Sequence, residues 1–112
     1  MTLNEYQAQA RAYATGGGLR PDYAVMGLAE EAGEAVGKVA KFVRATGRDA
    51  NDIALDGAWR GKLVLELGDA LWMVSNAAAA LNVELDDLAL QNLVKLSGRK
   101  RRGTICGEGD GR

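Results

Sequence analysis

The chain has 112 residues, 47% of them hydrophobic, a size that fits a single domain. Its 14 basic and 15 acidic residues nearly cancel, which excludes an overall electrostatic field of the kind that attracts nucleic acid or a membrane surface. The one cysteine, Cys106, excludes an internal disulfide, and the lack of a membrane-length apolar run or a signal-peptide core predicts a cytoplasmic protein with no membrane partner.

Helical periodicity dominates the first part of the chain. Residues 2–15 are predicted to form a helix that begins with a capping box made by Thr2 and Glu5 and ends at three consecutive glycines. A second helix opens after Pro21 and continues to about Ala45, because apolar residues recur there at three- and four-residue steps. Since Pro21 is the only proline, long uninterrupted helices are expected.

The rest of the chain predicts a loop, two further helices and a tail. Residues 46–61 are rich in Gly, Asp and Asn, which predicts a loop with room for one short helical turn. Residues 62–81 form a helix that is apolar nearly all round and therefore belongs in the middle of the structure. A last helix begins near residue 82 or 84 and ends near 101, and residues 102–112 are predicted to be a flexible or closing tail.

Four carboxylates lie in matched pairs on the second and third predicted helices. Glu31 and Glu34 are three residues apart, and Glu66 and Asp69 repeat this spacing, so each pair occupies one helix face. Two such pairs can converge between antiparallel helices. Because the helix 62–81 is otherwise apolar, Glu66 and Asp69 cannot simply face water, and burying them unpaired would carry a steep desolvation cost.

Three things could neutralise these carboxylates: Lys or Arg partners, proton uptake, or a divalent cation. Lys38 and Lys41 follow the glutamates of the second helix, and the third helix has only Lys62 near its start. Two lysines do not balance four or five carboxylates, which favours Mg²⁺ or Mn²⁺ bound by oxygen ligands. The chain has no histidine, which excludes the Glu-x-x-His pairs of di-iron bundles and leaves a zinc site without ligands. The competing interpretation of EExxE is a solvated acidic helix face.

The segments EEAGE at 30–34 and ELGD at 66–69 are similar to the EExxE…ExxD signature of the MazG-like nucleotide pyrophosphohydrolases. These are all-α enzymes related to the dimeric dUTPases and the all-α dCTPases. Further similar blocks are NEYQ at 4–7, ELGDALW at 66–72 and NLVKLSGRKRRG at 92–103, so the resemblance covers nearly the whole chain. The gap between the two acidic motifs is longer than is usual in the family, and the extra length falls in the predicted loop.

The resemblance implies hydrolysis of a nucleoside triphosphate between the α and β phosphates, which gives a monophosphate and pyrophosphate. At the matched positions it implies Mg²⁺, for which Mn²⁺ can substitute, with these ligands: Glu31, Glu34, Glu66 and Asp69. It assigns Glu30, together with Glu31 and Glu34, to catalysis, through a further ion or the attacking water. Such a cation neutralises the triphosphate and lowers the pKa of a bound water, so no protein nucleophile is needed.

Candidate phosphate-binding groups lie on the last predicted helix. Asn92, Lys95 and Arg99 share one face by their spacing, and the resemblance places the Asn and the Lys at the phosphates or beside the metal. The alternative for GRKRR at 98–102 is a solvated helix end whose cations complement the helix dipole. Lys41, like Lys38, is predicted either to reach phosphate or to pair with neighbouring acids.

Recognition of the base is predicted from fewer signals. The aromatic side chains available for stacking are Trp59, Trp72, Tyr6, Tyr13 and Tyr23. Trp72 follows Asp69 by three residues and so lies near the site, although an aromatic side chain at helical spacing usually packs in a core. Asn76 lies seven residues after Asp69 and nearly in line with it, and a buried amide there needs hydrogen-bond partners that a base or sugar could supply. Gln7 is a third candidate for the base.

The expected fold is an all-α, four-helix, MazG-like bundle in one domain over residues 1–112, completed by oligomerisation. We expect a homo-oligomer, a dimer or a tetramer, because the other helices cannot cover the helix 62–81. The resemblance also implies dNTPs or non-standard NTPs as substrates, in nucleotide house-cleaning. The alternative is a non-catalytic, metal-stabilised interaction module whose basic last helix docks on nucleic acid or a partner protein; the balanced net charge argues against nucleic acid.

Overall fold

The computed structural model describes residues 1–107, so residues 108–112 of the predicted tail lie outside the described part. The elements are these: α1 Leu3–Arg11, the 3-10 helix η1 Gly16–Leu19, α2 Pro21–Thr46, the 3-10 helix η2 Ala50–Leu55, α3 Gly57–Ala80 and α4 Leu85–Arg101. The described residues contain no strand, which confirms the all-α prediction.

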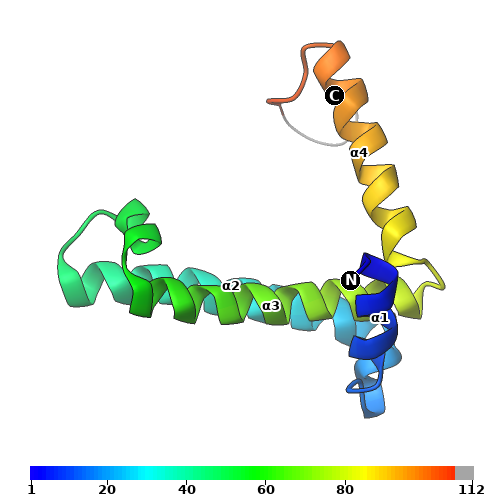
Figure 1. Cartoon of the computed structure of the whole chain (residues 1–112), viewed down its shortest axis with the longest axis horizontal. Helices are drawn as coiled ribbons and strands as arrows, with labels where there is room; N and C mark the ends of the chain where they lie inside the picture. The colour runs from blue at the N-terminus through cyan, green and yellow to red at the C-terminus, as the bar shows by residue number, and fades with distance from the viewer. Residues whose placement is uncertain (108–112) are drawn as a thin grey trace.

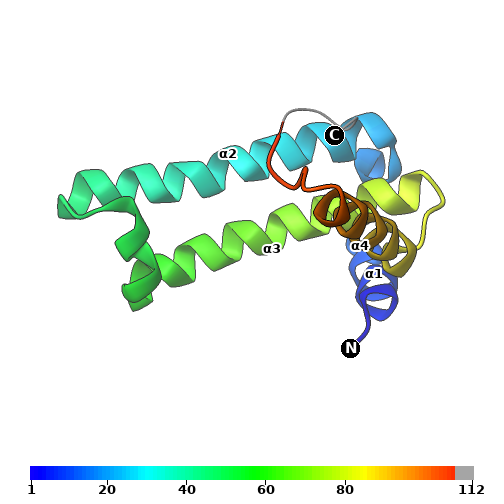
Figure 2. The same ribbon diagram turned by 90° about the horizontal axis from the view of Figure 1, so that it is seen from above.

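The two longest helices, α2 and α3, lie side by side as an antiparallel hairpin (Figure 1). Seen from above, α1 lies beside α3 at the end where α2 begins and α3 ends, and α4 leaves from that same end (Figure 2). In the first view α4 stands steeply away from the hairpin. The α2–α3 pair is therefore the body of the chain, and α1 and α4 are attached at one end of it.

The first helix begins as predicted and ends earlier. Thr2 and Glu5 form the capping box, in which each side chain bonds the other residue's backbone N–H. The helix ends at Arg11, four residues before the predicted end. The carbonyl of Ala10 accepts the backbone N–H of Tyr13 at 3.1 Å and also the indole Nε1 of Trp72 at 3.2 Å, and the second bond ties the end of α1 to α3.

The predicted loop at 46–61 was wrong in its last five residues, because α3 begins at Gly57 and not near Lys62. Asp56 is the N-cap, and its carboxylate accepts from the backbone N–H of Trp59 at 3.2 Å. The Trp59 ring packs edge-on against the ring of Phe42, with centroids 6.0 Å apart. A side-chain cap and an aromatic contact thus outweigh the low helix propensity of glycine. The predicted short turn is η2.

Arg48 holds the closed end of the hairpin together. Its guanidinium lies 5.3 Å from the centroid of the fully buried Phe42 ring, and it pairs with Asp52 at 3.5 Å and Asp56 at 3.4 Å. Gly47 ends α2 at a positive φ of 66°, a left-handed conformation that glycine adopts without strain. The contacts give the extra chain length between the acidic motifs a structural role.

Side chains from α1 cap the start of α4. Glu84, the N-cap residue, makes no side-chain cap bond. Instead, the backbone N–H of Leu85 donates to Gln7 Oε1 at 3.0 Å, and that of Asp86 donates to Asn4 Oδ1 at 2.9 Å. These bonds join residues about 80 positions apart in the sequence, and they help to set the direction in which α4 leaves the hairpin.

Large apolar side chains remain exposed along α3 and α4. By length and composition α3 could cross a membrane, although a single helix of this kind is weak evidence for a membrane span. Within one chain 28% of its most apolar window is buried, so most of this window is left uncovered. The helix packs along α2 and carries Glu66 and Asp69, as the core helix of a bundle would. The exposed set comprises Val64, Leu65, Leu67 and Leu71 of α3 and Leu88, Leu90, Leu93, Val94 and Leu96 of α4.

Candidate metal centre

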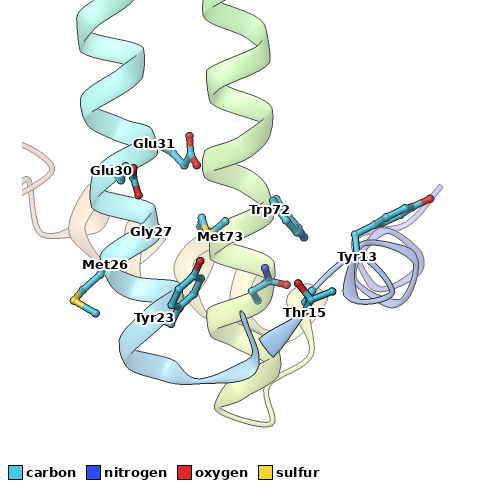
Figure 3. A pocket seen from close by; sticks show the side chains of 11 residues that line it. Tyr13, Thr15, Tyr23, Met26, Gly27, Glu30, Glu31, Trp72 and Met73 are labelled. Atoms are coloured by element: carbon cyan, nitrogen blue, oxygen red, sulfur yellow. The ribbon is translucent and has the colours of Figure 1, made fainter. Parts of the chain in front are cut away.

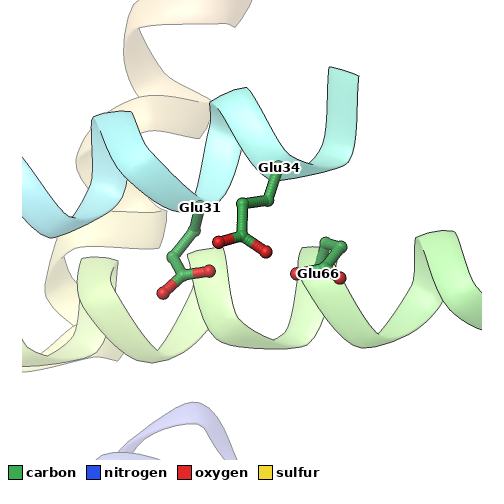
Figure 4. A group of neighbouring side chains, drawn as sticks. All are labelled: Glu31, Glu34 and Glu66. Atoms are coloured by element: carbon green, nitrogen blue, oxygen red, sulfur yellow. The ribbon is translucent and has the colours of Figure 1, made fainter. Parts of the chain in front are cut away.

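Three carboxylates from α2 and α3 meet between the two helices. Glu31 and Glu34 extend from α2 toward α3, and Glu66 lies on the facing side of α3 (Figure 4). One oxygen of each carboxylate lies within 4.8 Å of the others. The convergence follows from the i, i+3 spacing on α2 and the antiparallel packing of the hairpin. We call these three residues the acidic cluster.

A lysine neutralises part of the acidic cluster. Lys38 Nζ lies 2.8 Å from Glu66 Oε1, and the two side chains are 24% and 12% exposed. The pKa of Glu31 nevertheless lies above its usual range, first because of partial burial and then because of the nearby carboxylates of Asp69, Glu34 and Glu30. Among the described residues, the cluster thus sets three carboxylates against the one ammonium paired with Glu66. Three oxygen donors without a nitrogen or sulfur ligand among them fit a hard divalent cation.

Asp69, the fourth predicted ligand, is not part of the acidic cluster. Its carboxylate is close enough to raise the pKa of Glu31, yet the residue is exposed and lines a cavity of about 450 Å³ on the α1 side of α3. Burial and the charge of Asp69 together raise the pKa of Tyr6, which lines the same cavity. A ligand role for Asp69 stays a prediction.

A second cavity, of about 370 Å³, lies directly beside the acidic cluster (Figure 3). Glu31 belongs both to the cluster and to the wall of this cavity. The side chains that line it come from α2, from α3 and from the segment after α1: Tyr13, Ala14, Thr15, Tyr23, Met26, Gly27, Glu30, Glu31, Trp72, Met73 and Asn76. We call it the nucleoside-sized cavity. One side of this cavity is thus aromatic and apolar, and the side nearest the acidic cluster carries Glu30 and Glu31.

Asn76 brings a polar group to this cavity that the described residues do not satisfy. The residue is 2% exposed, and its Oδ1 has no hydrogen-bond partner among them. A buried polar atom without a partner is costly, so a ligand that donates a hydrogen bond there would gain from it. Trp72 also lines the cavity, and its indole is fixed by the bond to Ala10. Packing and cavity-lining roles therefore coexist in Trp72.

Gln7 does not line the nucleoside-sized cavity, so its predicted contact with the base needs correction. The residue is 7% exposed, and its Oε1 accepts from Leu85 N. Its Nε2 donates to Val83 O at 3.0 Å and to Ser75 O at 3.5 Å. Both ends of the amide are thus used to join α1 to the α3–α4 corner.

The predicted phosphate-binding residues of α4 are not brought to the acidic cluster within one chain. Asn92 and Lys95 line a depression of about 290 Å³ on α4 itself. Within residues 1–107, α4 contacts α1 and α3 but not α2. Arg99 is 6% exposed, so the solvated helix end considered for this segment does not describe Arg99. Lys41 is exposed on α2.

Comparison with known proteins assigns the family. A family model described as MazG nucleotide pyrophosphohydrolase domain matches residues 21–104. The chain belongs to this family. It is also 42% identical over 90 residues to "Gene 37 protein" of Mycobacterium phage L5, a match that covers 80% of the chain and 75% of the phage protein. No solved structure matches the chain significantly. The acidic cluster lies wholly within the matched MazG domain.

Of the cavity residues, Gly27 was not predicted, and Tyr23 was considered only as one of several aromatic rings that could stack on a base, although the sequence contained a signal for both. Tyr23, Gly27 and Glu31 follow one another at four-residue steps and so share a face of α2. At Gly27 a Cβ would lie 2.7 Å from Met73 Sδ, which shows how closely the helices approach at the cavity. Tyr13 carried no such signal, because it follows the end of α1 and its position depends on the tertiary fold.

Proposed function

We propose that this MazG domain hydrolyses nucleoside triphosphates, dNTPs or non-standard NTPs, to the monophosphate and pyrophosphate with Mg²⁺ as cofactor. The observation that carries the proposal is the double position of Glu31, in the acidic cluster and in the wall of the nucleoside-sized cavity. A nucleotide with its base in the cavity would have its phosphates beside the carboxylates. The volume of about 370 Å³ falls within the usual range of small-molecule sites.

The carboxylates divide the work of such a site. Glu31, Glu34 and Glu66 supply the oxygen atoms that would hold the cation. When bound, a divalent cation neutralises phosphate charge and acidifies a coordinated water. Glu30 is exposed and lines the cavity next to Glu31, so its carboxylate can orient water or accept its proton. Ser75 is 1% exposed in α3 and has no histidine to activate it, so the proposal uses no protein nucleophile.

The nucleoside fits the cavity through one polar and several flat contacts. Asn76 offers its unsatisfied Oδ1 to a donor on the base or sugar. Trp72 and Tyr23 supply flat ring surfaces for packing. The amide of Asn76 has two N–H donors as well as an acceptor oxygen. It can therefore bind the edge of more than one base, and the proposal does not specify which.

The phosphate-binding half of the site requires a second copy of the chain in this proposal. Asn92 and Lys95 lie on a helix that has no contact with α2 among the described residues, and that helix exposes Leu90, Leu93 and Val94. Burial of these side chains against another copy would remove apolar surface from water and bring α4 to a neighbouring hairpin. We therefore propose a homo-oligomer, a dimer or a tetramer, in the cytoplasm.

The test is an assay of pyrophosphate release from a panel of standard and modified nucleoside triphosphates with Mg²⁺ or Mn²⁺. Release from at least one nucleotide is expected, and Glu34→Gln should reduce it by roughly 100-fold or more, an effect typical of a lost metal-binding interaction. Glu84→Gln removes a comparable carboxylate far from the cluster and should keep wild-type activity. Asp69→Asn decides whether the fourth predicted ligand takes part.

Two results would contradict the proposed chemistry. Unchanged release by Glu34→Gln, with helicity intact by circular dichroism, would place the reaction elsewhere. No release from any nucleotide, with helices intact, would favour the non-catalytic interaction module instead.

A further inference from the structure

Among the described residues, Lys38 brings a positive charge to the acidic cluster through an ion pair with Glu66. Its Nζ lies 2.8 Å from Glu66 Oε1 and joins α2 to α3 at the point where the carboxylates meet. It follows Glu34 by four residues, so the two side chains lie on one face of α2. The exposed fractions of 24% for Lys38 and 12% for Glu66 show that water screens this pair less than a surface pair.

The ion pair and a divalent cation would use the same carboxylate. Glu66 supplies one of the three oxygen atoms of the acidic cluster and also accepts from Lys38. A lysine ammonium is a compact charge on a flexible four-carbon stem, so it can leave a carboxylate by side-chain rotation without movement of the helices. A cation bound by Glu66 would also repel the ammonium at this distance.

We propose that Lys38 is a resident counter-ion of the metal centre: its ammonium holds Glu66 while no cation is bound, yields Glu66 to the incoming cation, and then pairs with the phosphates of the nucleotide. The inference rests on the proposed function and adds to it a positioning residue that also sets metal affinity. The lysine keeps the cluster assembled between turnovers and is released where the negative charge of a triphosphate arrives.

Calorimetric titration of the nucleotide-free protein with Mn²⁺ tests this role directly. Lys38→Met removes the competitor for Glu66, and the affinity of this variant for Mn²⁺ is expected to rise about tenfold, the order of magnitude for removing one unit charge a few Å from the ion. Lys38→Arg replaces the ammonium with a planar fork that can hold a carboxylate through two bonds, so its affinity for Mn²⁺ should fall below wild type. From tightest to weakest, Mn²⁺ should bind Lys38→Met, then the wild type, then Lys38→Arg.

Lys41→Met is the matched control, since it removes the same charge from the same helix at an exposed position one turn beyond Lys38. Its Mn²⁺ affinity should stay within twofold of wild type. Without metal, thermal denaturation should show a lower melting temperature for Lys38→Met than for wild type. Saturating Mn²⁺ should narrow that difference, because tighter binding stabilises the folded state more.

A role in phosphate binding predicts a separate kinetic effect. The assay uses saturating metal and a nucleotide that the wild type hydrolyses. For this nucleotide Lys38→Met should have a KM about tenfold higher, with a smaller change in kcat, and Lys38→Arg should have a KM between those of the wild type and Lys38→Met.

The outcomes separate the two proposals. A wild-type protein that binds no Mn²⁺ contradicts the proposed function itself. A wild type that binds Mn²⁺ while Lys38→Met binds it equally or more weakly overturns the counter-ion role, since the lysine would then support the metal site and not compete with it. An unchanged KM in Lys38→Met overturns the transfer to phosphate.

Discussion

The α2–α3 hairpin and α4 differ in how much of a nucleotide site each completes within one chain. The hairpin brings Glu31, Glu34 and Glu66 together, places Lys38 on Glu66, and opens directly into the nucleoside-sized cavity. By contrast, α4 carries the predicted phosphate-binding side chains but stands away from the hairpin with apolar residues exposed (Figure 1).

The difference shows which interactions build each region. Carboxylates three residues apart on long packed helices converge through local geometry and pairwise helix packing alone. The direction of α4 depends on a few bonds from α1 and on whatever covers its exposed apolar face. We therefore expect substitutions in the hairpin to act within one chain and those in α4 to act between chains.

The most demanding test of this distinction is complementation between two inactive variants. Glu34→Gln and Lys95→Met should each lose most activity when assembled alone. If Lys95 serves the cluster of a neighbouring copy, the co-expressed variants should regain roughly a quarter of wild-type activity, because random pairing makes half of the dimers mixed and one of two sites in each is intact. Persistently inactive mixtures, with mixed oligomers verified by mass spectrometry, would show that Lys95 acts within its own chain.

A charge placed on the apolar face of α4 should separate the copies. Leu93 is 63% exposed in the single chain, and Leu93→Glu should lower the mass in light scattering to that of the monomer, 11.8 kDa, and reduce activity by about tenfold or more. Asn51→Asp adds a negative charge at an exposed position in η2, outside α4, and should keep the wild-type mass. A wild-type protein that is already monomeric would contradict the proposed assembly.

The buried side-chain amides of Asn76 in α3 and Gln7 in α1 should differ in their effects on stability and on nucleotide binding. Because Oδ1 of Asn76 has no partner among the described residues, Asn76→Leu should leave the free energy of unfolding unchanged or raise it. The same substitution should raise KM for the preferred nucleotide by about tenfold, the equivalent of one hydrogen bond of about 1.4 kcal/mol. An unchanged KM would remove Asn76 from the proposed nucleoside site.

Gln7 should show the reverse behaviour. Its amide bonds Leu85, Val83 and Ser75, so Gln7→Leu leaves buried backbone groups without partners and should cost about 2 kcal/mol of stability. For a domain of this size that corresponds to a fall in melting temperature of roughly 8 °C. Selectivity among bases should not change. A change in selectivity without loss of stability would restore Gln7 as a candidate for the base.

The smallest predicted effect is a gain in stability from Glu31→Gln without metal. Partial burial and neighbouring acids raise the pKa of Glu31 above its ordinary 4.5, so its ionised form destabilises the fold. The protonated form of Glu31 is the one that the wild-type fold favours, so its stabilising contribution is lost as the pH rises through the raised pKa of Glu31. The variant should melt roughly 3 °C higher than wild type at neutral pH, with the difference vanishing in acid, and should lose the metal-induced rise. A variant that melts lower at neutral pH would contradict this account of the charge.

Local patterns predicted more of this protein than long-range ones. The capping box at Thr2 and Glu5 and the helical character of α2 and α3 follow from neighbouring residues, as does the spacing of the acids. The start of α3 was missed because glycines at its beginning resemble a loop, while the cap at Asp56 and the packing of Trp59 on Phe42 decide the structure.

The role of Gln7 and the direction of α4 could not be predicted from local pattern. Gln7 meets Leu85 across 78 residues of sequence, and no local pattern encodes that contact. For the same reason, the spacing of Asn92 and Lys95 predicted that they share a helix face but not whether that face lies near the hairpin of the same chain or of another copy. The pairing of Lys38 with Glu66 was among the alternatives that the residues left open, and the structure places it beside two further carboxylates.

The central claim is that carboxylates of α2 and α3 hold a divalent cation, and anomalous diffraction from crystals grown with Mn²⁺ tests it most directly. We predict an anomalous peak between the two helices, at roughly 2.1–2.2 Å from carboxylate oxygens of Glu31, Glu34 and Glu66, with Lys38 turned away from Glu66. Crystals with Mn²⁺ in the solution but no peak at this position, and with Lys38 still bonded to Glu66, would contradict the account.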